Sequence, residues 1–108
     1  MAAYAPNVMP AEQREAARED VFYRTRCTTA GGAVEPAQVV NISASGFMAR
    51  SEGDFAEGDR ITIRLPVVGS VAAEVRWALG GRIGCRFNEM IGLAPYLSLL
   101  SELVAQTR

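Results

Sequence analysis

The sequence contains no histidine and no lysine, and both absences narrow what the chain can do. Histidine is the usual general base and the commonest metal ligand, so every Ser-His or Cys-His dyad is excluded. No paired-acid motif stands in its place. We therefore expect a protein that is not an enzyme and that holds no metal and no cofactor. All 11 basic residues are arginines. GC-rich coding explains that bias simply, so the bias is not evidence for a ligand.

Cysteine is scarce, and long apolar runs are missing. Cys27 and Cys85 are isolated in strand-like apolar segments and lack the spacing of metal ligands. Buried free thiols are expected, with a strained or regulatory disulfide as the alternative. No stretch reaches the length of a membrane span, and residues 1–20 lack the apolar region of a secretory signal. These features predict a cytoplasmic protein without membrane insertion.

The chain is rich in apolar residues, and its length is that of a single domain. Of its 108 residues 49% are hydrophobic, which is enough for a core without disulfides or metal. The net charge is −1, which argues against a protein that coats DNA or RNA through a general basic field. We therefore expect neither DNA nor RNA as a partner.

Short apolar and alternating segments, separated by glycine turns, predict six strands. The last segment changes to a period of three and four residues, which predicts an amphipathic helix from about Ala94 to Gln106. The expected fold is all-β with a C-terminal helix, a six-stranded antiparallel barrel over about residues 21–88. Residues 1–13 are expected to be a flexible leader, and 14–108 a single domain. The predicted strands are Val21 to Thr29, Val34 to Ile42, Phe47 to Ser51, Arg60 to Leu65, Val71 to Ala78 and Arg82 to Phe87.

A polar turn, Asn41-Ile42-Ser43-Ala44-Ser45-Gly46, joins the second and third predicted strands. Asn41 and Ser43 are two residues apart, so along a strand they would point to the same face. Gly46 can adopt a positive φ at the turn. Upstream, Arg14 and Arg18 lie four residues apart in a polar, helix-compatible segment. Taken alone, these residues are also compatible with a solvated helical turn and with side chains that satisfy backbone groups.

The order RxxxR, then (D/N)xSxxG, resembles the PilZ family of bacterial cyclic di-GMP receptors. The similarity runs from about Arg14 to Glu89 and includes the apolar pair after Gly46 and a GxxF from Gly84 to Phe87. The resemblance implies a six-stranded PilZ-like barrel with cyclic di-GMP as its ligand. It implies that two arginines clamp the ligand and that two short polar side chains project from the barrel to bond base edges or phosphate. The ligand-binding residues implied are Arg14, Arg18, Asn41, Ser43, Gly46 and Trp77.

Two of these positions have competing interpretations. Trp77 shares the alternating face of Val71, Ala73 and Val75, which predicts a core aromatic, while the resemblance allows it to stack on a bound base. Ser43 can serve the turn instead of the ligand.

The resulting hypothesis is a cyclic di-GMP receptor and adaptor that signals to an unknown effector protein through ordering of its arginine-bearing N-terminal segment. Control of motility, exopolysaccharide or biofilm formation is the process the resemblance suggests. The alternative is a PilZ-like interaction module that binds a protein and no nucleotide. A barrel for single-stranded nucleic acid is a third possibility, which the net acidic charge disfavours.

Overall fold

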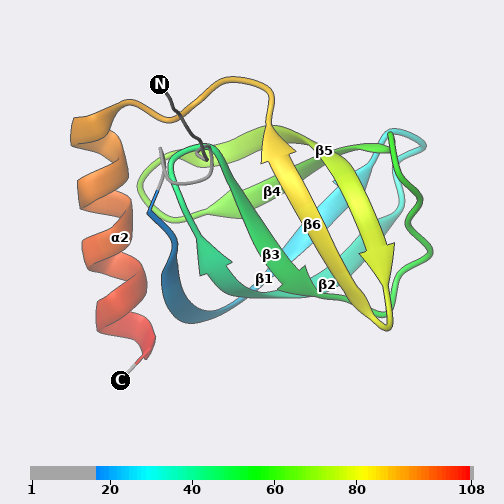
Figure 1. The fold of residues 1–108 in the computed structure, drawn as a ribbon, viewed down its shortest axis with the longest axis horizontal. Helices are drawn as coiled ribbons and strands as arrows, with labels where there is room; N and C mark the ends of the chain where they lie inside the picture. The colour runs from blue at the N-terminus through cyan, green and yellow to red at the C-terminus, as the bar shows by residue number, and fades with distance from the viewer. Residues whose placement is uncertain (1–16, 108) are drawn as a thin grey trace, which may run out of the picture.

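The computed structural model describes residues 17–107, which form six strands and one helix (Figure 1). The elements are β1 (Glu19–Thr29), β2 (Val34–Ile42), β3 (Gly46–Arg50), β4 (Arg60–Leu65), β5 (Gly69–Leu79), β6 (Arg82–Phe87) and α2 (Leu93–Thr107). The predicted fold class is confirmed. The bounds predicted for β2, β4 and β6 coincide with those observed, because glycine or proline lies near the ends of these strands.

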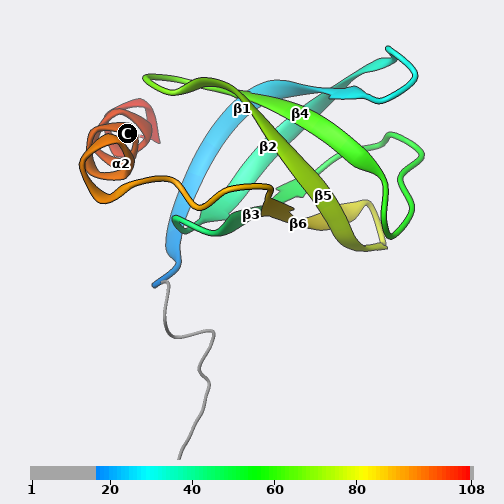
Figure 2. The ribbon, with the colours of Figure 1, turned by 90° about the horizontal axis from the view of Figure 1, so that it is seen from above.

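The sheet closes on itself in the order β1-β2-β3-β6-β5-β4, with every pairing antiparallel. Closure is completed between β1 and β4, where Cys27 lies opposite Ile63. A closed sheet leaves no edge strand to pair with another chain. Helix α2 stands beside the barrel and packs against β1 (Figures 1 and 2). No helix in the described part of the chain has the length and apolarity needed to cross a bilayer.

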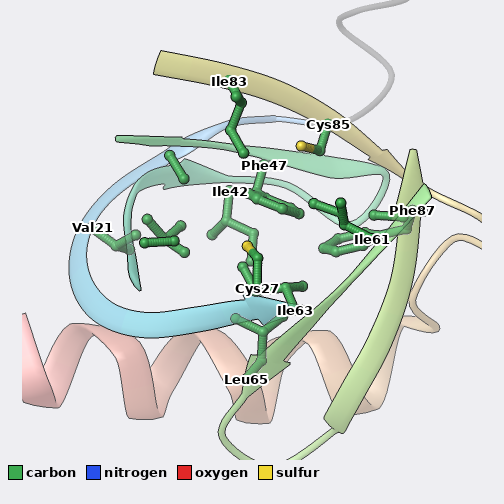
Figure 3. Close-up of a cluster of buried hydrophobic side chains, with 14 of the residues drawn as sticks. Val21, Cys27, Ile42, Phe47, Ile61, Ile63, Leu65, Ile83, Cys85 and Phe87 are labelled. Carbon is green, nitrogen blue, oxygen red and sulfur yellow. The ribbon is translucent and has the colours of Figure 1, made fainter. Parts of the chain in front are cut away.

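The interior of the barrel is filled by alternate side chains of all six strands (Figure 3). Phe47 and Phe87 pack against each other in this interior, with ring centroids 5.6 Å apart and an interplanar angle of 37°. Burial of each large apolar side chain contributes about 1.5–3 kcal/mol. Cys27 and Cys85 are both free and buried, as expected. Burial raises the pKa of Cys27 to about 11. The pKa of Cys85 rises to about 12 through burial and through the nearby Cys27.

Helix α2 is fastened to the barrel at the end of β2. Its inward face buries Tyr96, Leu99 and Leu103. The Tyr96 hydroxyl donates a hydrogen bond to the Ile42 carbonyl oxygen at 3.4 Å. Burial and the Glu19 carboxylate together raise the pKa of Tyr96. The helix, which packs against β1, is therefore also bonded to the end of the strand that leads into the polar turn.

Candidate functional site

The two polar motifs, separated by 23 positions in the chain, meet at one point on the barrel surface. Arg18 immediately precedes β1, and its Nη1 donates a hydrogen bond to Oδ1 of Asn41 at 2.9 Å. The contact is set by the β1–β2 ladder, in which Asp20 lies opposite Asn41. Arg14 lies outside the described residues.

Asn41 begins a row of outward-facing residues that crosses four neighbouring strands. It lies opposite Met48 on β3, Met48 lies opposite Gly84 on β6, and Gly84 lies opposite Trp77 on β5. Asn41 Nδ2 also makes a weak hydrogen bond to Met48 Sδ at 3.9 Å. We call Asn41, Met48, Gly84 and Trp77 the outer row. Sequence reasoning did not assign Met48 to the site, although its place in the strand alternation, one residue after inward Phe47, would have indicated an outward side chain.

The prediction that Trp77 is a core aromatic is wrong. Its side chain is 41% exposed and lies on the outside of the barrel. The β5–β6 register shifts between Val75 and Trp77, so the alternation that keeps Ala73 and Val75 inside does not continue to Trp77. The indole covers Gly84, where an added Cβ would overlap the indole ring. Gly84 thus lets the ring approach the β6 backbone closely.

The expectation that Ser43 projects from the barrel beside Asn41 is also wrong, because Ser43 is only 1% exposed. Strand β2 ends at Ile42, so strand alternation no longer governs where Ser43 points. Its hydroxyl lies 3.1 Å from that of Ser45 and accepts the Ser45 N–H at 3.2 Å. Ser43 therefore shapes the turn from within. Its involvement in ligand binding stays a prediction.

Gly46 is needed for a different reason than the expected positive φ. Among the residues described, the glycines with positive φ are Gly32, Gly58, Gly69, Gly80 and Gly81, and Gly46 is not one of them. It opens β3 opposite Arg86, where a Cβ would overlap the carbonyl oxygen of Cys85. Only glycine allows β3 and β6 to approach this closely at their shared end.

The turn is anchored from the side of β6 and its following loop. The Phe87 N–H donates to the Ser45 carbonyl and the Ile91 N–H donates to the Ala44 carbonyl, both at 2.9 Å. The backbone of the turn is therefore held independently of any ligand. A rigid support of this kind is what a preorganised binding site requires.

The chemistry on this surface is that of recognition. It offers a guanidinium, a carboxamide and an exposed indole, which suit phosphate, base edges and base faces respectively. Within residues 17–107 no group of three or more metal-ligating side chains occurs. Among residues 17–107 the ion pair found is between Arg76 and Glu74, at 3.9 Å. No carboxylate among these residues therefore neutralises the Arg18 guanidinium.

Comparison with known proteins agrees with this chemistry. The family model of the PilZ domain matches residues 12–106, a range that includes both polar motifs, the whole barrel and almost all of α2. A search of curated proteins finds no match. The fold, the order of the motifs and a match over nearly the whole length together show that this chain belongs to the PilZ family, whose domains are binding modules of the cyclic di-GMP receptor type.

Proposed function

We propose that this chain binds cyclic di-GMP and acts as a receptor and adaptor in the cytoplasm. The observation that carries the proposal is the hydrogen bond between Arg18 and Asn41, which brings the arginine motif onto the polar turn. If each motif only satisfied backbone groups close to itself, no hydrogen bond between the two motifs would be expected. The ligand is a second messenger and is not turned over.

Each group of the site matches a part of the ligand. Cyclic di-GMP carries two phosphates and two guanines. A guanidinium bonds guanine O6 and N7 with two parallel N–H groups, or it neutralises a phosphate. Arg14 and Arg18 supply two such groups. The Asn41 amide nitrogen, whose contact in the free protein is the weak one to Met48, is available to donate to the ligand.

Of the remaining residues of the proposed site, two position the turn and one offers a stacking surface. Ser43 and Gly46 hold the turn at the edge of the ligand, the first by its buried hydroxyl and the second by allowing close strand approach. The indole of Trp77 offers a face on which a guanine stacks. Stacking of a base on an aromatic side chain contributes about 1–3 kcal/mol.

The N-terminal segment is the part of the protein that signals ligand binding to a partner. In this proposal the bound ligand orders the residues around Arg14 and Arg18 over the outer row, and an effector protein recognises the ordered surface. Motility, exopolysaccharide synthesis or biofilm formation is the process such an adaptor would control.

Titration calorimetry with cyclic di-GMP tests the proposal, with GTP and a short RNA as controls. Saturable binding of cyclic di-GMP alone is expected. Absence of heat with all three ligands would instead favour the interaction module that binds no nucleotide.

Arginine variants test the site within the same titration. Arg14→Ala and Arg18→Ala should each cost about 1.5–3 kcal/mol of binding free energy, because each removes a charge-assisted hydrogen-bond donor. That corresponds to roughly ten- to a hundredfold weaker binding. Arg64→Ala, an exposed arginine on β4, is the matched control and should bind normally. Wild-type affinity in both test variants would contradict the assigned site.

A further inference from the structure

A second outward row of residues, next to the outer row, carries three arginines. Arg24 on β1 lies opposite Gln38 on β2, and Gln38 lies opposite Arg50 on β3. Arg50 in turn lies opposite Arg82 on β6. We call Arg24, Gln38, Arg50 and Arg82 the arginine row. It is offset from the outer row by two residues along β3 and β6, about 7 Å.

The positive charges of this row are not compensated by ion pairs within the described part of the chain. The salt bridge found there joins Arg76 to Glu74 and involves none of the three arginines. Arg50 and Arg82 are directly opposed, with Cα atoms about 4.5–5.5 Å apart as in any antiparallel pair. Like charges in that position destabilise a sheet. A bound anion would remove this repulsion.

A groove of about 490 Å³ is lined by three residues of the arginine row, Arg24, Gln38 and Arg50, whereas Arg82 lines a neighbouring pocket. The backbone of Gly80 and Gly81 lines another part of the groove. These two glycines form the β5–β6 turn with φ values of 62° and 78°, which two-residue hairpins of the primed type require. Having no side chains, they leave the end of the groove open.

The floor of the groove is held in place by Ser51, which is buried. The Ser51 hydroxyl donates to the Pro36 carbonyl at 2.8 Å, and the Ser51 N–H donates to the Gly81 carbonyl at 2.9 Å. These two bonds tie β2, the end of β3 and the glycine turn together. The arginines therefore project from a rigid support.

We propose that this groove binds the terminal phosphate of a small phosphomonoester. Such a group carries a charge of about −1.5 to −2 and three acceptor oxygens, which suits the guanidinium groups of Arg24 and Arg50 that line the groove. A single carboxylate has neither the charge nor the oxygens to engage them all. Glu52 is the one carboxylate among the residues that line the groove, and the lining is still net positive.

This site is separate from the proposed cyclic di-GMP site. None of Arg18, Asn41, Ser43, Gly46 and Trp77 lines the groove. Cyclic di-GMP, moreover, contains phosphodiesters and no terminal phosphate. The inference therefore does not depend on the proposed function, and either can fail alone.

Amide chemical shifts of the labelled full chain, titrated with inorganic phosphate, glycerol phosphate and GMP, test the proposal. Saturable shifts should appear at Gln38, Arg50, Gly81 and Arg82. Equal affinity for the three probes would indicate recognition of the phosphate alone, and tighter binding of GMP would indicate an added contact to the base. Either result supports the site. Shifts that do not saturate, or that centre on Asn41 to Gly46, would overturn it.

Charge variants sharpen the same titration. Arg24→Gln and Arg50→Gln should each weaken phosphate binding about tenfold or more, and both side chains are exposed, so the fold should persist. Glu52→Gln should strengthen binding, because it removes a repelling charge from the groove. Arg64→Gln on β4 is the control and should leave the affinity unchanged. Equal affinity in the wild type, Arg24→Gln and Arg50→Gln would refute the proposal.

Discussion

At Trp77 a shift in strand register determines whether an aromatic ring lies in the core or on the surface. The shift between Val75 and Trp77 turns the indole outward, and Gly84 provides the space beneath it. The chain has a single tryptophan, so its fluorescence reports on this surface alone. Trp77 is therefore both a proposed contact and a built-in probe.

Replacing Trp77 with alanine should weaken cyclic di-GMP binding by about 1–3 kcal/mol, the usual contribution of a stacked base. Leu79→Ala is the matched control, because Leu79 lies two residues along the same strand and is 79% exposed. It should bind as the wild type does. Affinities from calorimetry decide, and quenching of the wild-type fluorescence at saturation provides a second measure. Equal affinities of all three proteins would exclude stacking on Trp77.

The two buried thiols should lower the folding stability of the protein at alkaline pH. Their pKa values rise from 9.0 in the unfolded chain to about 11 for Cys27 and about 12 for Cys85, chiefly through burial. The folded protein therefore binds more protons than the unfolded one above pH 9, so stability falls as pH rises through this range. Urea unfolding at pH 9 and pH 11 should show this loss. A double variant, Cys27→Ala and Cys85→Ala, should show a smaller pH dependence, and an unchanged dependence would contradict the assignment to the thiols.

At the scale of elements, the polar turn is a junction between β2, β3, β6 and α2. Ser45 and Ala44 accept hydrogen bonds from Phe87 and Ile91, and Tyr96 of α2 donates to Ile42. A change in the turn would therefore be transmitted to the loop before the helix. These hydrogen bonds restrain the backbone of the turn without any ligand.

Gly46→Ala should disrupt this junction. The added Cβ would overlap the Cys85 carbonyl, so β3 and β6 must separate at their paired ends. Overpacking of this kind typically costs about 1–3 kcal/mol. Thermal unfolding of the free protein should show the loss, with Gly31→Ala as control, because a Cβ at Gly31 meets only the Thr29 hydroxyl at 4.0 Å. Unchanged stability of Gly46→Ala would mean that the strands adjust without cost.

On the scale of the whole molecule, a closed barrel has little freedom to change shape when a ligand binds. All six strands are paired on both sides, and the core is packed with aliphatic and aromatic side chains. Arg18 immediately precedes β1 and so is not part of the paired strands. Ordering of the segment that carries Arg14 and Arg18 is therefore the change that we expect a partner to detect.

Hydrogen exchange with and without cyclic di-GMP tests this ordering. Amides from about residue 13 to 20 and from Asn41 to Gly46 should gain protection on binding, while those of β4 should barely respond, since that strand lies away from the outer row. Ordering the N-terminal segment costs conformational entropy, which offsets part of the favourable contact energy. The affinity for cyclic di-GMP should therefore be lower than the contacts with the ligand alone suggest. Protection that is already complete without ligand would exclude this mechanism and leave binding itself untouched.

Pattern and composition were sufficient to predict the fold, together with a set of candidate site residues that lacked Met48. Alternating apolar residues between glycine turns determine strands because each strand must bury one face, and the change of period after Phe87 determines the helix for the same reason. The two short motifs identified the family. The resemblance implied that Arg18 and Asn41 contact one ligand, and only the structure showed the hydrogen bond between them.

Which candidate site residues face outward depends on how the strands pair, and this was not visible in the sequence. Trp77 was misplaced because a register shift is a property of two paired strands and leaves no mark in the alternation of one. Ser43 was misplaced because strand alternation was extended to it, although β2 ends at the preceding residue, Ile42. Gly46 needs its missing side chain because of Cys85, which lies on another strand. The arginine row, likewise, comes from β1, β3 and β6, so that only the pairing of β1 with β2, β2 with β3 and β3 with β6 brings its charges together.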